Sequence, residues 1–161
     1  MLRWTMDITD LSILRCLRNN SRASLGQIAD ELGVSKATVS RRLSRLEEEG
    51  YVSGYHMNTN YAKLGLMRAQ LGLQVSGTAV TTVIEELRQF PEIASAMKTF
   101  GDHSLICSVY TSSVDSLYEL IQTHVLKIPH IENVEVDIII DSVILNPHAE
   151  LDLYQRKLNR F

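Results

Sequence analysis

The sequence predicts an α+β fold in two parts, a helical part at the N-terminus and a mixed strand-and-helix part after it. In the first fifty residues, apolar side chains recur at helical spacing and are interrupted by short turns. Beyond residue 65, stretches of strict apolar and polar alternation, typical of half-buried strands, take turns with helical stretches. The chain has 161 residues, 45% hydrophobic and 22% charged, which is enough for two small globular domains.

Capping residues predict the first two helices. Asp7 can cap the first helix, which is expected to end near Asn19. Ser24 and Gln27 match a capping box, in which the hydroxyl and the amide satisfy each other's backbone donors at the start of the second helix. Gly33 ends that helix, because glycine accepts a left-handed backbone without strain.

A third helix follows after a two-residue connection. Ser35 is its expected N-cap, and Gly50 is the residue at which it stops. Val39 and Leu43 face inward at helical spacing. Two helices joined by such a short turn cross steeply, so the sequence predicts a helix-turn-helix whose second helix projects its N-terminal half from the surface.

The outward side of this third helix carries cations, hydroxyls and small side chains, a combination suited to the major groove of DNA. Residues 22–46 hold five basic and two acidic side chains, whereas residues 51–161 hold eight basic and twelve acidic ones. An ordinary solvated helix face is the alternative for any single arginine. The whole set favours DNA binding, and the predicted contact residues are Ser24, Ser35, Lys36, Thr38, Ser40, Arg41, Arg42 and Arg45.

The rest of the chain predicts a linker and a second domain. The expected boundaries are 1–50 for the winged helix-turn-helix, 51–65 for a linker that begins as a strand, and 66–161 for the second domain. The order strand, helix, strand, strand, helix, strand is that of a ferredoxin-like βαββαβ fold. The expected elements are a strand at 69–75, a helix at 80–87, an extended run at 93–100, a strand at 105–110, a helix at 114–125 and a strand at 134–140.

One face of this sheet is expected to lack helices. Ile106, Tyr110 and Ile139 fall on it, so the sequence predicts a homodimer that covers them. A short amphipathic tail, with Leu151 and Tyr154 on its apolar side, is expected to dock locally.

Several other classes of protein are not favoured. Cys16 and Cys107 lie far apart in apolar patterns and are expected to be core thiols, and the five histidines lack metal-site spacing. We therefore expect no metal and no cofactor. No apolar run approaches the ~20 residues that a membrane span needs, and the first ten residues lack a signal peptide's apolar stretch, so a cytoplasmic location is expected.

Several motifs resemble the Lrp/AsnC (feast/famine) transcription regulators. They are Asp10-x-x-Ile13-Leu14, Leu32-Gly33-Val34-Ser35, Thr38-Val39-x-Arg41-Arg42-Leu43-x-x-Leu46-Glu47-x-x-Gly50, Gly54-Tyr55 and Leu64-Gly65. The resemblance implies dimers that assemble further, commonly into octamers, binding of operator DNA, and modulation by an amino acid. It places the effector at a Gly-Asp loop, here Gly101 and Asp102, with Ser104 where many members carry another aspartate. An ordinary hairpin turn is the alternative for Gly101-Asp102.

An enzyme remains as the alternative function, because sirohaem decarboxylases resemble this family in both domains. Those enzymes carry a Tyr-Asn-x-Trp-Phe type stretch where this chain has His103-Ser104-Leu105-Ile106-Cys107, and a lone histidine beside a turn is expected to be exposed to solvent. A ligand-sensing module with an inactive helix-turn-helix is a third possibility. The basic helix face, together with the lack of any nucleophile with a matching base, favours a regulator without enzyme activity.

Overall fold

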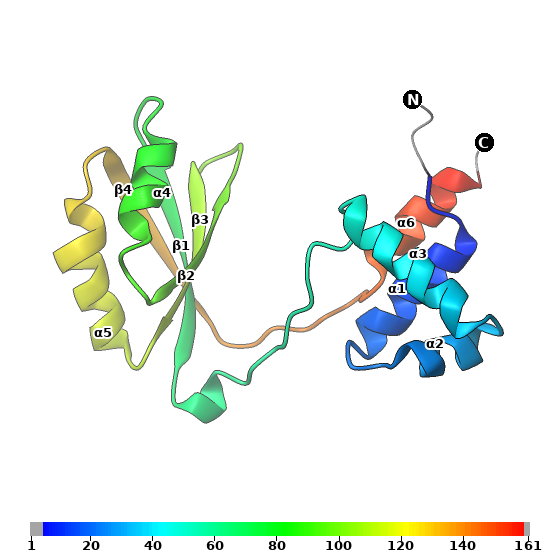
Figure 1. Ribbon diagram of the computed structural model, residues 1–161. Helices are drawn as coiled ribbons and strands as arrows, with labels where there is room; N and C mark the ends of the chain where they lie inside the picture. Colours follow the sequence, from blue (N-terminus) through cyan, green and yellow to red (C-terminus); the bar gives the residue numbers. More distant parts are fainter. Residues whose placement is uncertain (1–4, 160–161) are drawn as a thin grey trace. The chain divides into compact units, whose positions relative to one another are not determined.

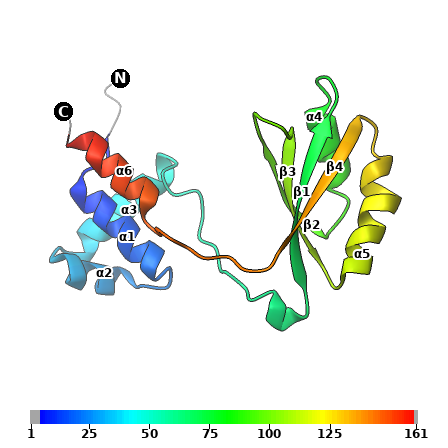
Figure 2. The ribbon, with the colours of Figure 1, turned by 180° about the vertical axis from the view of Figure 1, so that it is seen from behind.

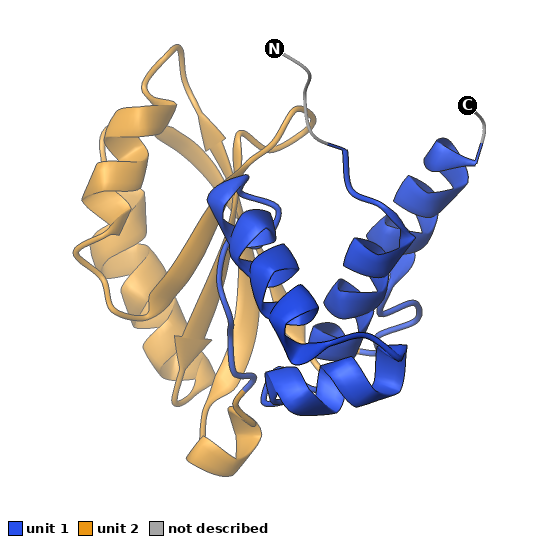
Figure 3. Ribbon diagram, turned by 45° about the vertical axis from the view of Figure 1, so that its right-hand side comes forward, with its two compact units in different colours: residues 1–58, 143–161 blue, residues 59–142 orange. Residues whose placement is uncertain are grey.

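The computed structural model describes residues 5–159, which form two compact units connected by two chain segments (Figures 1 and 2). The first unit, blue in Figure 3, comprises the described residues up to Asn58 and those from Val143 onward. The second unit, orange in Figure 3, comprises Thr59–Ser142.

The first unit is helical. Its helices are α1 (Ile8–Asn19), α2 (Leu25–Leu32), α3 (Lys36–Glu48) and α6 (Ala149–Leu158). The predicted caps are confirmed: Asp7, Ser24 and Ser35 each accept a backbone hydrogen bond at a helix start, and Gly33 is left-handed with φ 65°. The helices enclose an apolar core of Met6, Leu11, Ile13, Cys16, Ile28, Ala29, Val39, Leu46 and Leu151.

Helix α6 corrects the expected domain boundary, because the C-terminal tail belongs to the helical unit and not to the domain expected over 66–161. Leu151 is 8% exposed within the core of the first unit, and Tyr154 packs against the same core. Arg15 on α1 donates to Asp152 Oδ1 at 2.8 Å and to Gln155 Oε1 at 2.7 Å. An amphipathic stripe shows that a helix has an apolar face, but not which apolar surface that face will meet.

The strand expected at the start of the linker is wrong. Residues 52–60 contain neither helix nor strand, and no described strand pairs with them. They are held to the end of α3 instead: Val52 N donates to Leu46 O, and Tyr55 Oη donates to Glu47 Oε1 at 2.8 Å. Burial and this bond to Glu47 raise the pKa of Tyr55 to about 12. A β-prone sequence without a neighbouring strand has no partner for its backbone groups, so it forms no sheet.

The second unit has the predicted ferredoxin-like order. Its elements are a short 3₁₀ turn (Ala62–Leu64), β1 (Met67–Val75), α4 (Val80–Leu87), β2 (Ile93–Lys98), β3 (Leu105–Thr111), α5 (Val114–Glu119) continued by a π turn (Leu120–His124) and a 3₁₀ turn (Val125–Lys127), and β4 (Ile131–Ile139). The strands form one antiparallel sheet in the order β2-β3-β1-β4.

Alternation along the strands divides the sheet into two faces. Leu71 on β1 and Cys107 on β3 are paired and fully buried, and they belong to one apolar core with Val83 of α4 and Leu117 of α5. Both cysteines of the chain are buried and free, as expected of core thiols. Helices α4 and α5 lie on this side of the sheet (Figure 1).

The opposite face of the sheet carries no helix of the second unit. Tyr110 pairs with Arg68, which pairs on its other side with Ile139, and Ile106 pairs with Gly72. Ile106, Tyr110 and Ile139 are half-buried. This is the face on which the sequence predicts a partner. In the described part of the chain, no helix is long and apolar enough to cross a membrane.

The docking of α6 gives a testable prediction. Replacing Leu151 with alanine removes apolar volume from a buried site and should lower the free energy of unfolding of the helical unit by about 2 kcal/mol, measured by urea denaturation. Leu153 lies on the same helix but is 62% exposed, so Leu153→Ala is the matched control and should change little. Equal effects of the two substitutions would show that α6 does not dock through Leu151.

Candidate nucleic-acid interface and ligand loop

Local sequence explains how α3 is set at the surface. The left-handed Gly33 ends α2, and after one further residue the side chain of Ser35 accepts a hydrogen bond from Thr38 N at 3.1 Å. Val39 and Leu46 are fully buried on the inner side of α3. Because an α-helix turns once in 3.6 residues, the burial of these two positions fixes which positions point away from the core.

Most of the predicted contact residues lie on the outer side of the helix-turn-helix. Lys36, Arg41 and Arg45 are exposed, and Thr38 and Ser40 are half-buried. From Lys36 to Leu46 there is no acidic side chain, so this side of α3 has a positive potential.

Three of the hydroxyl-bearing residues in this set, Ser24, Ser35 and Thr38, form hydrogen bonds at helix starts. Ser35 Oγ lies 2.8 Å from Thr38 Oγ1, and Ser24 forms the predicted capping box with Gln27, whose Oε1 accepts from Ser24 N at 2.8 Å. Ser24 and Ser35 are exposed, so both lie at surface helix N-termini, where backbone N–H groups attract anions.

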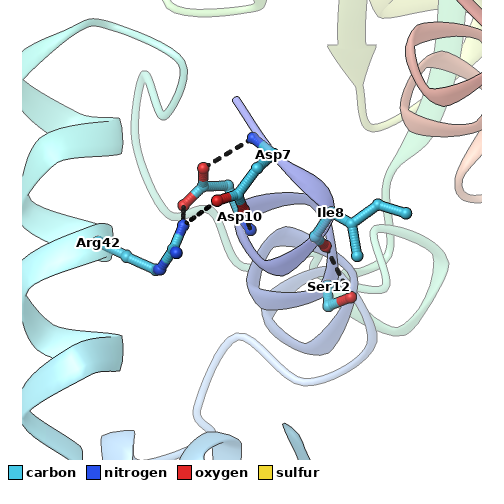
Figure 4. A network of polar contacts seen from close by, with 5 residues as sticks. All are labelled: Asp7, Ile8, Asp10, Ser12 and Arg42. Atoms are coloured by element: carbon cyan, nitrogen blue, oxygen red, sulfur yellow. Dashed lines mark hydrogen bonds and ion pairs between the residues drawn. The ribbon is translucent and has the colours of Figure 1, made fainter. Parts of the chain in front are cut away.

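Arg42 was predicted to contact DNA, but in the structure its side chain bonds to two aspartates at the start of α1. Its Nη1 donates to Asp7 Oδ2 at 2.7 Å and to Asp10 Oδ1 at 2.8 Å (Figure 4). Asp10 is fully buried, and the Nε atom of Arg42 is buried as well. Arg42 therefore turns toward α1, since position 42 shares the inner side of α3 with Val39 and Leu46.

Sequence reasoning missed Asp7 and Asp10 as partners of a side chain on α3. A signal was present, because Asp7 and Asp10 have capping-box spacing and Arg42 stands three residues after Val39 and four before Leu46. An arginine at inward spacing needs a buried acidic partner.

The β2–β3 loop brings together the predicted ligand residues. Gly101 and Asp102 are exposed at its tip, and the Asp102 carbonyl accepts a hydrogen bond from Gln74 Nε2 at 3.1 Å. Ser104, the third predicted ligand residue, also bonds to β1: its N donates to Leu73 O at 2.8 Å and its Oγ accepts from Val75 N at 3.1 Å. Ser104 thus fastens the loop to β1.

A cavity of about 480 Å³ lies beside this loop. Its lining residues are Val80 at the start of α4 and Lys98, Thr99, Phe100, Gly101, His103 and Ser104, whereas Asp102 is not among them. Lys98 and Thr99 line it and were not predicted from the sequence. Lys98 Nζ donates to Thr81 Oγ1 at 3.2 Å, so the Lys98 ammonium group is held at the edge of this cavity.

His103 also lines the cavity, and the expectation that it is exposed to solvent is wrong, because its side chain is only 23% exposed. Its ring lies over Gly72, where an added Cβ would come within 2.7 Å of ring atoms. Its Nε2 is 3.3 Å from Glu135 Oε2. The absence of a side chain at Gly72 is what lets the ring rest on the open face of the sheet.

The described residues contain no group of three or more His, Cys, Asp or Glu side chains that could hold a metal ion. The outer side of α3 offers cations, hydroxyls and backbone amides, and the cavity at the β2–β3 loop offers backbone groups, one lysine and one histidine, with the Asp102 carboxylate beside it on the loop.

Comparison with known proteins matches both units. Residues 6–53 match a family described as winged helix-turn-helix DNA-binding, and residues 68–148 match the Lrp/AsnC ligand binding domain. The HTH-type transcriptional regulator Ptr1 of Methanocaldococcus jannaschii is 30% identical over 136 residues, which cover 84% of this chain and 92% of that protein.

Two solved structures share the fold. The structure of Escherichia coli AsnC has a TM-score of 0.78 at 23% identity and covers 89% of this chain and 97% of its own. A transcriptional regulator of Neisseria meningitidis, solved as a complex with L-methionine, has a TM-score of 0.80 at 18% identity and covers 88% of this chain and 94% of its own.

The names of these relatives support a regulator rather than the tetrapyrrole-pathway enzyme considered as the alternative. The helix-turn-helix with its basic face, the ferredoxin-like sheet and the two family matches agree with one another. The chain belongs to the Lrp/AsnC family of DNA-binding transcriptional regulators.

Proposed function

We propose that this regulator reads operator DNA through the outer side of α3 and adjusts its binding in response to a small effector at the β2–β3 loop. The observation that supports DNA reading most directly is the exposure of Lys36, Arg41 and Arg45 on a helix whose opposite side is buried. A helix placed in this way fits the major groove.

Each part of the surface has a distinct role in this proposal. Ala37 and Ser40 are small, so they let α3 approach the base edges closely. Arg41 is one residue before the inward-turned Arg42 and donates to guanine O6 and N7. The N-termini of α2 at Ser24 and of α3 at Ser35 bind backbone phosphates and set the register.

The proposed effector is an amino acid or a similar small molecule. Gly101 exposes backbone groups that suit a carboxylate, and Asp102 supplies a carboxylate for an ammonium group. The L-methionine complex of the structurally similar Neisseria meningitidis protein supports this class. Ser104 lines the cavity and also holds the loop in place for such a ligand.

We also propose a homodimer, with further assembly toward an octamer. The support is the open face of the sheet, where Ile106, Tyr110 and Ile139 are half-buried and no helix of the second unit covers them. A dimer presents two copies of α3 and so favours a pseudo-palindromic operator. We expect the protein to act in the cytoplasm, where the chromosome lies, and to have no enzyme activity.

Arginine 41 gives a direct test of sequence reading. A bidentate contact to guanine is worth about 1 to 3 kcal/mol of discrimination, so Arg41→Ala should weaken operator binding roughly 5- to 150-fold while changing affinity for random DNA little. The operator is first selected from genomic DNA fragments, and affinities are then measured by gel shift at several salt concentrations.

The matched control is Arg88→Ala. Arg88 is an exposed, ion-paired arginine at the C-terminal end of α4 in the second unit, so its removal should leave the affinities for operator and for random DNA unchanged. Equal losses on operator and on random DNA for Arg41→Ala would show a phosphate contact, not base reading.

Asp102 gives a test of the ligand loop. A panel of amino acids is screened by the rise in thermal midpoint of the protein, since a ligand that binds the folded state stabilises it. Asp102→Asn should weaken binding of the best ligand at least tenfold, because it removes the charge that pairs with the ammonium group. Glu119→Gln, an exposed carboxylate on α5, is the control. An unchanged affinity in Asp102→Asn would exclude this role for Asp102.

A further inference from the structure

The two carboxylates at the start of α1 and one guanidinium nitrogen of α3 form a closed set of hydrogen bonds (Figure 4). Asp7 Oδ1 accepts from Asp10 N at 3.0 Å, and Asp10 Oδ2 accepts from Asp7 N at 2.9 Å. The remaining oxygens, Asp7 Oδ2 and Asp10 Oδ1, both accept from Arg42 Nη1. Every carboxylate oxygen of the two aspartates thus has one donor within the set, whereas Arg42 Nε is buried without a hydrogen-bond partner.

This set joins the recognition helix to α1 across the core. Asp10 is fully buried and is followed by the buried Leu11, while Arg42 lies between Val39 and Leu46 on the inner side of α3. The side chain of Arg42 is 27% exposed and that of Asp10 is 1% exposed. The ion pair is therefore a part of the α1–α3 contact and not a surface pair.

The pKa values of Asp7 and Arg42 both shift in the direction that favours their charged forms. Burial raises the pKa of Asp7, but the hydrogen bond from Arg42 and the one from the Asp10 amide outweigh it, so the pKa of Asp7 is lowered overall. The hydrogen bonds to Asp10 and Asp7 raise the pKa of Arg42. The stabilisation from Asp7 is accordingly present above the usual aspartate pKa and is lost only as the pH falls through its lowered pKa.

A buried ion pair such as that of Asp10 and Arg42 adds little to the free energy of folding. Removing two charges from water costs about as much as their attraction returns, and apolar side chains of similar size often fill the site equally well. Apolar contacts such as that of Val39 have little directional preference, whereas hydrogen bonds have a preferred angle and weaken steeply when the angle is poor. What distinguishes the Asp7, Asp10 and Arg42 hydrogen bonds from apolar contacts is therefore their dependence on direction, not their contribution to stability.

We propose that Asp10 and Arg42, assisted by Asp7, are positioning residues for DNA reading: they fix the rotation of α3 about its axis, and thereby the direction of Arg41. Arg42 itself is not a DNA contact. This inference rests on the proposed function of α3 in reading operator DNA.

The test separates stability from reading with three variants: Asp10→Asn, Arg42→Met and the double variant. Arg42→Met alone leaves the buried Asp10 carboxylate unpaired and should lower the unfolding midpoint, and the double variant should recover much of it. The ratio of operator to random-DNA affinity should fall at least tenfold in all three variants. The affinity for random DNA should stay within about twofold of the wild type.

Arg15→Met is the matched control. Arg15 is also an arginine of the helical unit in an intramolecular ion pair, 2.8 Å from Asp152, and its side chain is 29% exposed. Arg15→Met should lower the unfolding midpoint but leave the ratio of operator to random-DNA affinity unchanged, because Arg15 forms hydrogen bonds with α6 and not with α3.

Two results would overturn the proposal. If the affinity ratio returns with stability in the double variant, the set has only a structural role. If Asp10→Asn keeps the ratio while Arg42→Met loses it and lowers the salt dependence by about one phosphate contact, Arg42 is a DNA contact. A wild-type protein that does not prefer its selected operator would instead refute the proposed function itself.

Discussion

The burial of Val39 and Leu46 on one side of α3 is the constraint on which the proposed DNA-binding surface depends. Both side chains are fully enclosed with Leu11 and Ile28, and helical periodicity then leaves Lys36, Arg41 and Arg45 outside. Hydrophobic burial defines which side of α3 faces outward, but it restricts the rotation of α3 about its own axis only loosely. The bonded set of Asp7, Asp10 and Arg42 adds the directional part of the constraint.

Sequence reasoning succeeded where the determining interactions are local. The Ser24–Gln27 capping box, the left-handed Gly33 and the Ser35 cap are each settled within four residues, and all three are as predicted. The strand order of the second unit followed from the period of its apolar residues, because that period differs between strands and helices. The exposure of Lys36, Arg41 and Arg45 on α3 followed from the same local pattern.

Errors arose where distant parts of the chain decide the outcome. Arg42 looks like its neighbour Arg41 in the sequence, and only the approach of α1 turns it inward. The tail containing Leu151 has an apolar side, yet its choice of the helical unit depends on Arg15 and on the core that α1 provides. The bond of the loop residue Ser104 to β1 is likewise a contact between distant parts of the chain, and the sequence did not predict it.

The most direct measurement of the central claim is protection of guanine N7 atoms from methylation in the selected operator, because these atoms lie in the major groove. The account predicts that the bound wild-type protein protects guanines in each half-site, at positions related by the two-fold symmetry of a dimer. Full reactivity of every guanine in a site that is demonstrably occupied would contradict the placement of α3 in the major groove.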